Sequence, residues 1–168
     1  MTYGVRVDRH RLRFMSAHMA TWAGACEPLH GHNYQLTVEV EGDLTDDSWV
    51  IDFSLLKRIA RERCESIDHT FLLQRDSPIL TIAEDGDDWR ITAPGDRHYQ
   101  FPKADVSLLP IDNTTAERLA QWFHDEIAAA LQAEAIGNIG SLRVEVEEAP
   151  GQAAWYAAPL TSARRAPT

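Results

Sequence analysis

Strict alternation of apolar and polar residues predicts two β-strands, at 32–40 and at 142–148. The apolar positions are Tyr34, Leu36, Val38 and Val40 in the first and Leu142, Val144 and Val146 in the second. Because successive strand residues point to opposite faces, the apolar positions of each strand share one buried face. A third, less regular strand is expected in the N-terminal stretch through Phe14.

Helical periodicity replaces the alternation in two other segments. The apolar stripes consist of Phe53, Leu56, Ala60, Cys64 and Ile67 in the first segment, and of Ala116, Ala120, Phe123, Ile127 and Leu131 in the second. A stripe with this spacing is typical of an amphipathic helix with one buried side. Thr114 or Thr115 is suited to cap the start of the second helix.

The order of these elements predicts an α+β fold, an antiparallel sheet with two helices on one face. Between the helices, the runs 79–83 and 89–92 flank the acidic turn 84–88, which predicts a hairpin within the region 78–105. We expect a single domain over residues 1–157. Residues 158–168 are expected to form a flexible tail.

Composition and charge narrow the possible functions. The chain has 168 residues and a formal net charge of -10, which disfavours proteins that bind nucleic acid or anionic membranes through bulk positive charge. It has no apolar run long enough to span a membrane, and its N-terminus does not resemble a signal peptide. Two cysteines cannot form a disulfide scaffold, so a reducing, cytoplasmic setting is expected.

The buried face of each predicted strand ends in a group that is costly to bury alone. These groups are His18 after Leu12 and Phe14, His30 and His32 before Tyr34, and Glu148 after Val146. Imidazoles at i and i+2 on one strand face lie about 6.5–7 Å apart at Cα and can reach one metal ion. With His18 as a third ligand, one position stays open, as in catalytic zinc sites. The alternative for the histidine pair is an ordinary surface or core role.

Cys26 and the pair Asp68-His69 are further candidates. Cys26 could be a fourth ligand in a closed structural site, a thiolate base or nucleophile, or a small buried apolar group. Asp68 can orient the imidazole of His69 for proton transfer. Cys64 lies on the apolar stripe of the first helix, so we expect it to pack in the core.

Together these residues form an ordered set of motifs. They are Phe14-x-x-Ala17-His18, Cys26-x-x-x-His30-Gly31-His32-Asn33-Tyr34, Asp52-Phe53, Asp68-His69, Thr114-Thr115-Ala116-Glu117-x-Leu119-Ala120, and Glu148 with Tyr156. In this order, and over nearly the whole chain, the set resembles the 6-pyruvoyltetrahydropterin synthase / 6-carboxytetrahydropterin synthase (QueD) family. The resemblance implies a tunnelling fold (T-fold). It also implies a homohexamer, built as a dimer of trimers, with active sites between subunits.

The resemblance also implies roles for individual residues. His18, His30 and His32 would bind Zn²⁺, and Cys26 would be the catalytic thiolate. Asp68 and His69 would transfer protons to and from the substrate. Glu148 would anchor the pterin ring of a small-molecule substrate, with help from Thr114 and Thr115.

The short spacing between Cys26 and His30 resembles the bacterial 6-carboxytetrahydropterin synthases. That branch implies a lyase that converts 7,8-dihydroneopterin triphosphate, releasing acetaldehyde and triphosphate, in the queuosine or another deazapurine pathway. One alternative is a 6-pyruvoyltetrahydropterin synthase, which eliminates triphosphate; another is a non-catalytic pterin-binding protein with a structural zinc. An apparent insert at about 74–113 either decorates the sheet or the oligomer, or else reshapes the pocket or helps to bind phosphate.

Overall fold

The computed structural model describes residues 2–160. Its first half contains β1 (Tyr3–His18), β2 (Thr21–Trp22), β3 (Ala25–Cys26), β4 (His30–Gly42), α1 (Phe53–Ile67) and β5 (Phe71–Gln74). Its second half contains β6 (Thr81–Asp85), β7 (Asp88–Ala93), β8 (Arg97–Pro102), the 3-10 turn η1 (Lys103–Asp105), β9 (Val106–Leu109), α2 (Ala116–Ala133), β10 (Ile139–Ala149) and β11 (Gln152–Pro159). The expected order of strands and helices is confirmed, with additional short strands between the main elements.

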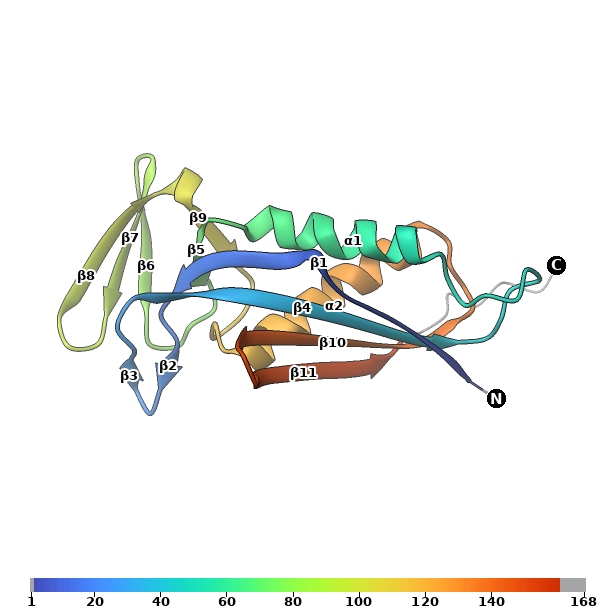
Figure 1. The fold of residues 1–168 in the computed structure, drawn as a ribbon. Coiled ribbons are helices and arrows are strands. Elements are labelled where there is room, and N and C mark those ends of the chain that lie inside the picture. Colours follow the sequence, from blue (N-terminus) through green and yellow to red (C-terminus); the bar gives the residue numbers. More distant parts are fainter. Residues whose placement is uncertain (1, 161–168) are drawn as a thin grey trace.

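The main sheet has six strands in the order β11-β10-β4-β1-β5-β9, and both helices cover one of its faces (Figure 1). The pairs β11-β10, β10-β4 and β4-β1 are antiparallel, as predicted. The sheet is nevertheless mixed, because β5 joins β1 in parallel and β9 joins β5 in parallel. A helix separates β5 from the strands before it, so the chain can return to the sheet in the parallel direction.

Both helices begin at capping side chains. A carboxylate oxygen of Asp52 accepts a hydrogen bond from Ser54 N at 2.9 Å, and Thr115 Oγ1 accepts one from Arg118 N at 3.4 Å. The buried stripe of α1 starts at Leu56 and not at Phe53, whose exposed fraction is 53%. Phe53 occupies the first turn, beyond the part of the helix that packs on the sheet.

A bulge in β1 changes which residues face the helices. Before it, Val7 is buried, and after it Leu12 and Phe14 are buried, so the core-facing positions change from odd to even. Pairing with β4 is interrupted between Asp8 and Arg13. The bulge contains Arg9 and Arg11, which both have positive φ, at 56° and 72°.

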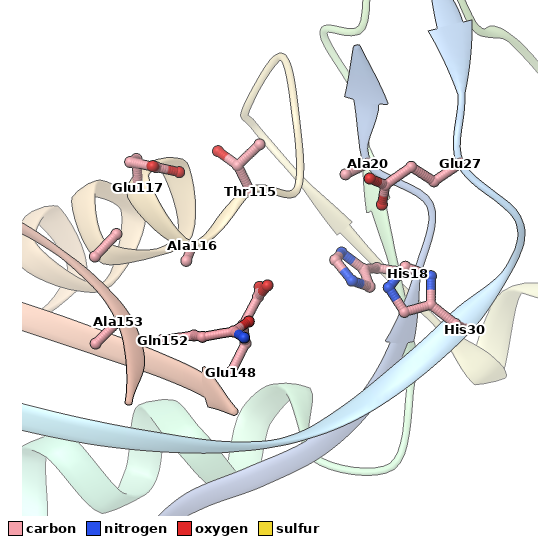
Figure 2. Close-up of a pocket in the computed structure, with 11 residues that line it drawn as sticks. His18, Ala20, Glu27, His30, Thr115, Ala116, Glu117, Glu148, Gln152 and Ala153 are labelled. Atoms are coloured by element: carbon pink, nitrogen blue, oxygen red, sulfur yellow. The ribbon is translucent and has the colours of Figure 1, made fainter. Parts of the chain in front are cut away.

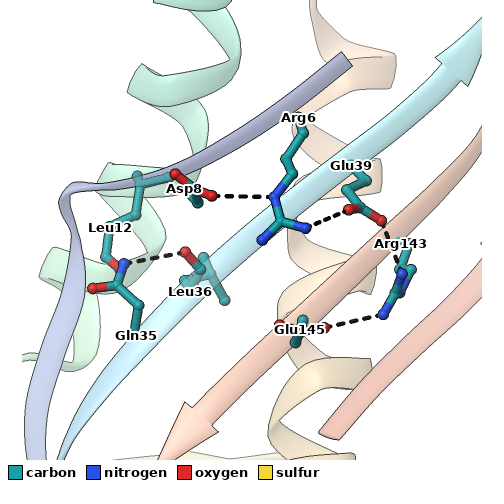
Figure 3. A network of polar contacts seen from close by, with 8 residues as sticks. All are labelled: Arg6, Asp8, Leu12, Gln35, Leu36, Glu39, Arg143 and Glu145. Carbon is teal, nitrogen blue, oxygen red and sulfur yellow. Dashed lines mark hydrogen bonds and ion pairs between the residues drawn. The ribbon is translucent and has the colours of Figure 1, made fainter. Parts of the chain in front are cut away.

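The helix-free face of the sheet carries a network of ion pairs (Figure 3). Arg6 contacts Asp8 at 3.1 Å and Glu39 at 2.9 Å, and Arg143 contacts Glu39 at 3.1 Å and Glu145 at 3.0 Å. Each exposed pair contributes little to stability by itself. Together these two arginines and three carboxylates give this face a polar surface, in contrast to the apolar face under the helices.

The expected hairpin is present as β6 and β7, but it belongs to a three-stranded sheet that β8 completes. This small sheet packs on the end of the molecule and encloses a second core, formed by Met19, Cys26, Phe71, Leu73, Leu80, Ile91 and Ala93. The strand β8 was not predicted from the sequence.

The C-terminal strand continues beyond the expected end of the domain. Ala158 pairs with Leu142 and Pro159 with Ser141, so the first two residues of the expected tail belong to β11. Residues 161–168 of that tail lie outside the described residues. Within residues 2–160, the helices lack the combination of length and apolar character that a membrane crossing needs.

Candidate metal centre and cavity

Three histidines meet where β1 ends and β4 begins. In the antiparallel register His18 lies opposite His30 and Ser16 lies opposite His32, so the three imidazoles come to one side of the strand pair. Their ring centroids are separated by 4.7 Å, 4.8 Å and 5.2 Å. One nitrogen from each ring lies within 4.8 Å of the others, a spacing at which three imidazoles can hold one metal ion.

Gly31 allows the two strands to approach this closely. A Cβ atom on Gly31 would lie 3.0 Å from the carbonyl oxygen of Ser16 and 3.5 Å from Ala17 Cα. Any larger residue would push β4 away from β1 at the point where His18 faces His30. The glycine in the His30-Gly31-His32 motif therefore serves the spacing of the ligands.

Backbone carbonyls fix the orientation of two of the imidazoles. His18 Nδ1 lies 3.0 Å from the carbonyl oxygen of Thr114, and His30 Nδ1 lies 2.8 Å from that of Pro28. A carbonyl only accepts, so in each ring Nδ1 carries the proton and Nε2 is left as the lone-pair nitrogen.

The histidine cluster fits a metal ion in two further respects. Nε2 of His18 and Nε2 of His32 are buried and have no hydrogen-bond partner among the described residues, an arrangement that a metal ion would satisfy. Burial, assisted by the two neighbouring imidazoles, lowers the pKa of His18 to about 4. His18 is therefore neutral at pH 7, as a metal ligand must be.

A cavity of about 340 Å³ opens beside two of the histidines, His18 and His30 (Figure 2). Its other walls come from the start of α2 and from the β10-β11 hairpin, with Thr115 and Glu148 among the lining residues. Figure 2 shows the carboxylate of Glu148 pointing into the space between these walls. The cavity therefore has nitrogen ligands at one end and a hydrogen-bond acceptor at the other.

The two adjacent threonines have different positions. Thr115 lines the cavity, whereas Thr114 is fully buried behind His18, with Oγ1 3.3 Å from His18 Nδ1 and 3.5 Å from Gln74 Oε1. The hydroxyl of Thr114 thus contacts the imidazole and not the cavity. Both threonines were expected to contact the pterin ring, because the sequence alone does not show which of them faces the cavity.

Cys26 and Glu27 point to different sides of the segment before β4. The Cys26 side chain is 8% exposed and packs in the second core, where burial raises the pKa of its thiol. Among the described residues it does not belong to the group of potential metal ligands. Glu27 lines the cavity near His18 and His30, and sequence reasoning missed it. Its place beside Cys26 and three residues before His30 was the available signal.

Asp68 and His69 form a tethered pair at the end of α1. Asp68 accepts a hydrogen bond from Met15 N at 2.8 Å and contacts His69 Nδ1 at 2.9 Å. Burial raises the pKa of Asp68, but these hydrogen bonds outweigh it and lower the pKa overall. His69 has a φ of 59°, a conformation that is uncommon for histidine and often found at functional sites.

This pair does not line the cavity that contains Glu148. His69 borders a second, more open hollow, whose lining also includes Met15, His32 and Phe101. The imidazole cluster therefore lies between two hollows, with His18 and His30 beside the first and His32 beside the second. Within one chain, the structure brings Glu148 to the same cavity as His18 and His30, but it leaves Asp68 and His69 apart from Glu148.

Comparison with known proteins identifies similar sequences. The family model described as 6-pyruvoyl tetrahydropterin synthase matches residues 8–159. A putative 6-carboxy-5,6,7,8-tetrahydropterin synthase of Methanocaldococcus jannaschii is 36% identical over 86% of this chain and 89% of its own length. The 6-carboxy-5,6,7,8-tetrahydropterin synthase of Aquifex aeolicus is 30% identical over 71% of this chain and 65% of its own length.

Solved structures share the fold. The 6-pyruvoyltetrahydropterin synthase of Plasmodium vivax has a TM-score of 0.90 at 30% identity, over 95% of this chain and 99% of the other. Variants of that enzyme, in which a catalytic glutamate is replaced by alanine or cysteine, also match with a TM-score of 0.90 at 29% identity over the same shares of both chains. A Caenorhabditis elegans protein of the same name matches at 16% identity with a TM-score of 0.59, over 93% of this chain and 95% of the other, a likeness of fold alone.

Proposed function

The chain belongs to the 6-pyruvoyl tetrahydropterin synthase family, and on this premise we propose that it is a zinc-dependent 6-carboxy-5,6,7,8-tetrahydropterin synthase. Its substrate would be 7,8-dihydroneopterin triphosphate, and acetaldehyde and triphosphate would be released. The observation that carries the proposal is the cavity with two imidazoles at one end and the carboxylate of Glu148 at the other. The names of the relatives from Methanocaldococcus jannaschii and Aquifex aeolicus support this product.

In this proposal each end of the cavity has its own task. Glu148 accepts hydrogen bonds from the amino group and ring N–H of the pterin, which places the substrate side chain toward His18 and His30. The three imidazoles would hold Zn²⁺, which supplies Lewis acidity that lowers the pKa of a bound hydroxyl. Thr115, at the start of α2, borders the same space and would contact the ring.

Two side chains are candidates for the base that removes a proton from the substrate. Cys26 as a thiolate would remove a proton from the substrate side chain. The alternative base is Glu27, whose carboxylate lines the cavity, whereas Cys26 packs in the second core. A glutamate is also a catalytic residue of the Plasmodium vivax enzyme. Glu27 therefore favours a second candidate function, the 6-pyruvoyltetrahydropterin synthase reaction, which eliminates triphosphate without releasing acetaldehyde.

Product analysis separates the two functions. The zinc-loaded protein is incubated with 7,8-dihydroneopterin triphosphate, pterin products are identified by mass spectrometry, and acetaldehyde is assayed. We expect 6-carboxytetrahydropterin with acetaldehyde, and loss of both in Cys26→Ala. A 6-pyruvoyl product, lost in Glu27→Gln but kept in Cys26→Ala, would establish the second function. Bound pterin that stays unchanged would contradict both functions and favour a non-catalytic pterin-binding protein.

We further propose that the working enzyme is a homohexamer with active sites between subunits. Asp68 and His69 border a different hollow from Glu148, and His69 has a 71% exposed side chain, so a second copy could bring this pair to the first cavity. The sheet ends in the edge strands β9 and β11, which a neighbouring chain can pair.

Mixing two inactive variants tests this arrangement. If Cys26 and His69 of one site come from different chains, mixed oligomers of Cys26→Ala and His69→Ala contain some sites in which both residues are intact. We expect such mixtures to regain activity after joint refolding. Mixtures that stay inactive, although each variant forms the native oligomer by sedimentation, would place the site within one chain. The cytoplasmic setting and the absence of nucleic-acid or membrane partners remain predictions.

A further inference from the structure

Arg97 connects the three-stranded sheet to the segment that carries Cys26 and Glu27. It is the first residue of β8, after a turn in which Gly95 and Asp96 have φ values of 80° and 56°. This tight turn returns the chain so that Arg97 pairs with Ala93.

The guanidinium of Arg97 reaches out of its own sheet. Its Nη1 donates to the carbonyl oxygen of Glu27 at 3.1 Å, and its Nη2 donates to that of Cys26. Its Nε donates to Pro94 O at 3.4 Å, which anchors the side chain at its base. One planar group therefore holds two successive carbonyls of the segment before β4, a geometry that suits the rigid fork of arginine.

The same small sheet also packs against the thiol of Cys26. Ile91 and Ala93 of β7 belong to the second core with Cys26, and both are buried. Cys26 is thus held from the sheet side through its side chain and through its carbonyl. Glu27, held by the same guanidinium, turns the opposite way and lines the cavity.

Two charged groups act on the thiol, and they oppose one another. Burial raises the pKa of Cys26, the positive charge of Arg97 lowers it, and the negative charge of Glu27 raises it. Of these two charged groups, Arg97 is the one that offsets the cost of forming a thiolate at this place.

We propose that Arg97 is a positioning residue of the candidate active site. By holding the carbonyls of Cys26 and Glu27, it determines that one side chain turns into the second core and the other into the cavity beside the histidines. The three-stranded sheet thereby acts as a support of the site, and not as a decoration of the fold. The catalytic consequence rests on the proposed function, but the positioning itself can be measured without turnover.

Alkylation of Cys26 measures the positioning and the charge separately. The rate of reaction with iodoacetamide is followed at the Cys26 peptide by mass spectrometry from pH 7 to 11, in the wild type, Arg97→Gln and Arg97→Lys. The midpoint of the profile reports the charge near the thiol, and the plateau at high pH reports how readily the segment opens. Cys64, fully buried in the main core, is an internal reporter of global opening. Arg90→Gln is the matched control, because Arg90 lies on the same small sheet but pairs with Asp85.

We expect the plateau to rise about fivefold in both Arg97 variants, because the carbonyl bonds are lost and the segment opens more often. The midpoint should move up in Arg97→Gln, with about tenfold less thiolate at a given pH, and should stay near the wild-type value in Arg97→Lys. Arg90→Gln should match the wild type in both respects. Zinc content should be unchanged in all variants.

Two results would overturn the proposal. The first is an Arg97→Gln profile that agrees with the wild type within twofold in plateau and midpoint. The second is an equal rise in alkylation of Cys64, which would show general loosening of the protein. If the wild type fails to convert 7,8-dihydroneopterin triphosphate, the proposed function fails, while the alkylation profiles still decide the role of Arg97. If the wild type does convert this substrate, kcat should fall about tenfold in Arg97→Gln, with KM unchanged.

Discussion

His18 Nδ1 lies 3.0 Å from the carbonyl oxygen of Thr114, so the end of β1 is joined to the loop that starts α2. This contact links the histidine cluster to the part of the cavity wall that Thr115 provides. A shift of the loop would therefore change the orientation of the imidazole as well as the shape of the cavity.

The side chain of Thr114 adds to this contact, and its loss should weaken metal binding. Thr114→Val removes the hydroxyl 3.3 Å from His18 Nδ1 but keeps the carbonyl. We expect zinc affinity to fall by up to about tenfold, at the low end of the effect of losing a partner behind a metal ligand. Competition with a chromogenic chelator measures this. An affinity equal to that of the wild type would mean that the carbonyl alone orients the ring.

Replacing one histidine of the cluster should abolish stable metal binding. His32→Ala leaves only two imidazoles, and we expect zinc affinity to fall by at least about a hundredfold, more than the loss of an outer partner. The metal content after dialysis, measured by plasma mass spectrometry, is the test. His98→Ala is the control, because His98 is an exposed histidine of β8 paired with Asp96. Full zinc content in His32→Ala would exclude the histidine cluster as the metal site.

The carboxylate of Glu148 should dominate affinity for the pterin ring. Glu148→Gln replaces an ionic acceptor in the cavity, and we expect the Kd for neopterin, read from its fluorescence, to rise about 10- to 100-fold. Glu147→Gln serves as the control on the same strand, since the carboxylate of Glu147 accepts a hydrogen bond from Gly151 N outside the cavity. Equal affinities of the two variants would contradict this role of Glu148.

Cys64 should make the fold sensitive to alkaline pH. Burial raises the pKa of Cys64 to about 12, so the folded state keeps a proton that the unfolded state loses above about pH 9. The resulting stabilisation is fully present below pH 9 and is lost as pH rises toward 12, by about 1.4 kcal/mol per pH unit. Urea unfolding of the wild type and Cys64→Ala from pH 8 to 11 measures this as a converging difference in the free energy of unfolding. Parallel curves would show that the thiol does not titrate in this way.

The sequence was sufficient to predict the elements that build the main core. Alternation located β4 and β10, and the helical stripes located α1 and α2 because each buries one continuous face. It was insufficient for the parallel strands β5 and β9, whose partners are distant in the chain. It also missed β8, none of whose residues is fully buried, although half-buried and exposed positions alternate along the strand and a Pro94-Gly95 turn could have marked its start.

The metal cluster could be predicted because its three histidines continue the buried rows of their strands. The different directions of the Glu27 and Cys26 side chains could not be predicted, since they depend on Arg97, a residue on another sheet and distant in the sequence. The different positions of Thr114 and Thr115 likewise follow from the packing of His18 against the loop.

The bulge in β1 imposes an arithmetic constraint on the length of the chain. From Asp8 to Arg13 the strand advances five residues while β4 advances only two, from Thr37 to Gln35, so three extra residues are accommodated. Because this number is odd, the buried face of β1 changes from odd-numbered to even-numbered residues across the bulge. This change places the side chains of Val7 and His18 on the same face of the sheet. Insertions or deletions in this stretch should therefore be tolerated in pairs, because any single one would leave His18 on the face of the sheet away from its two partners.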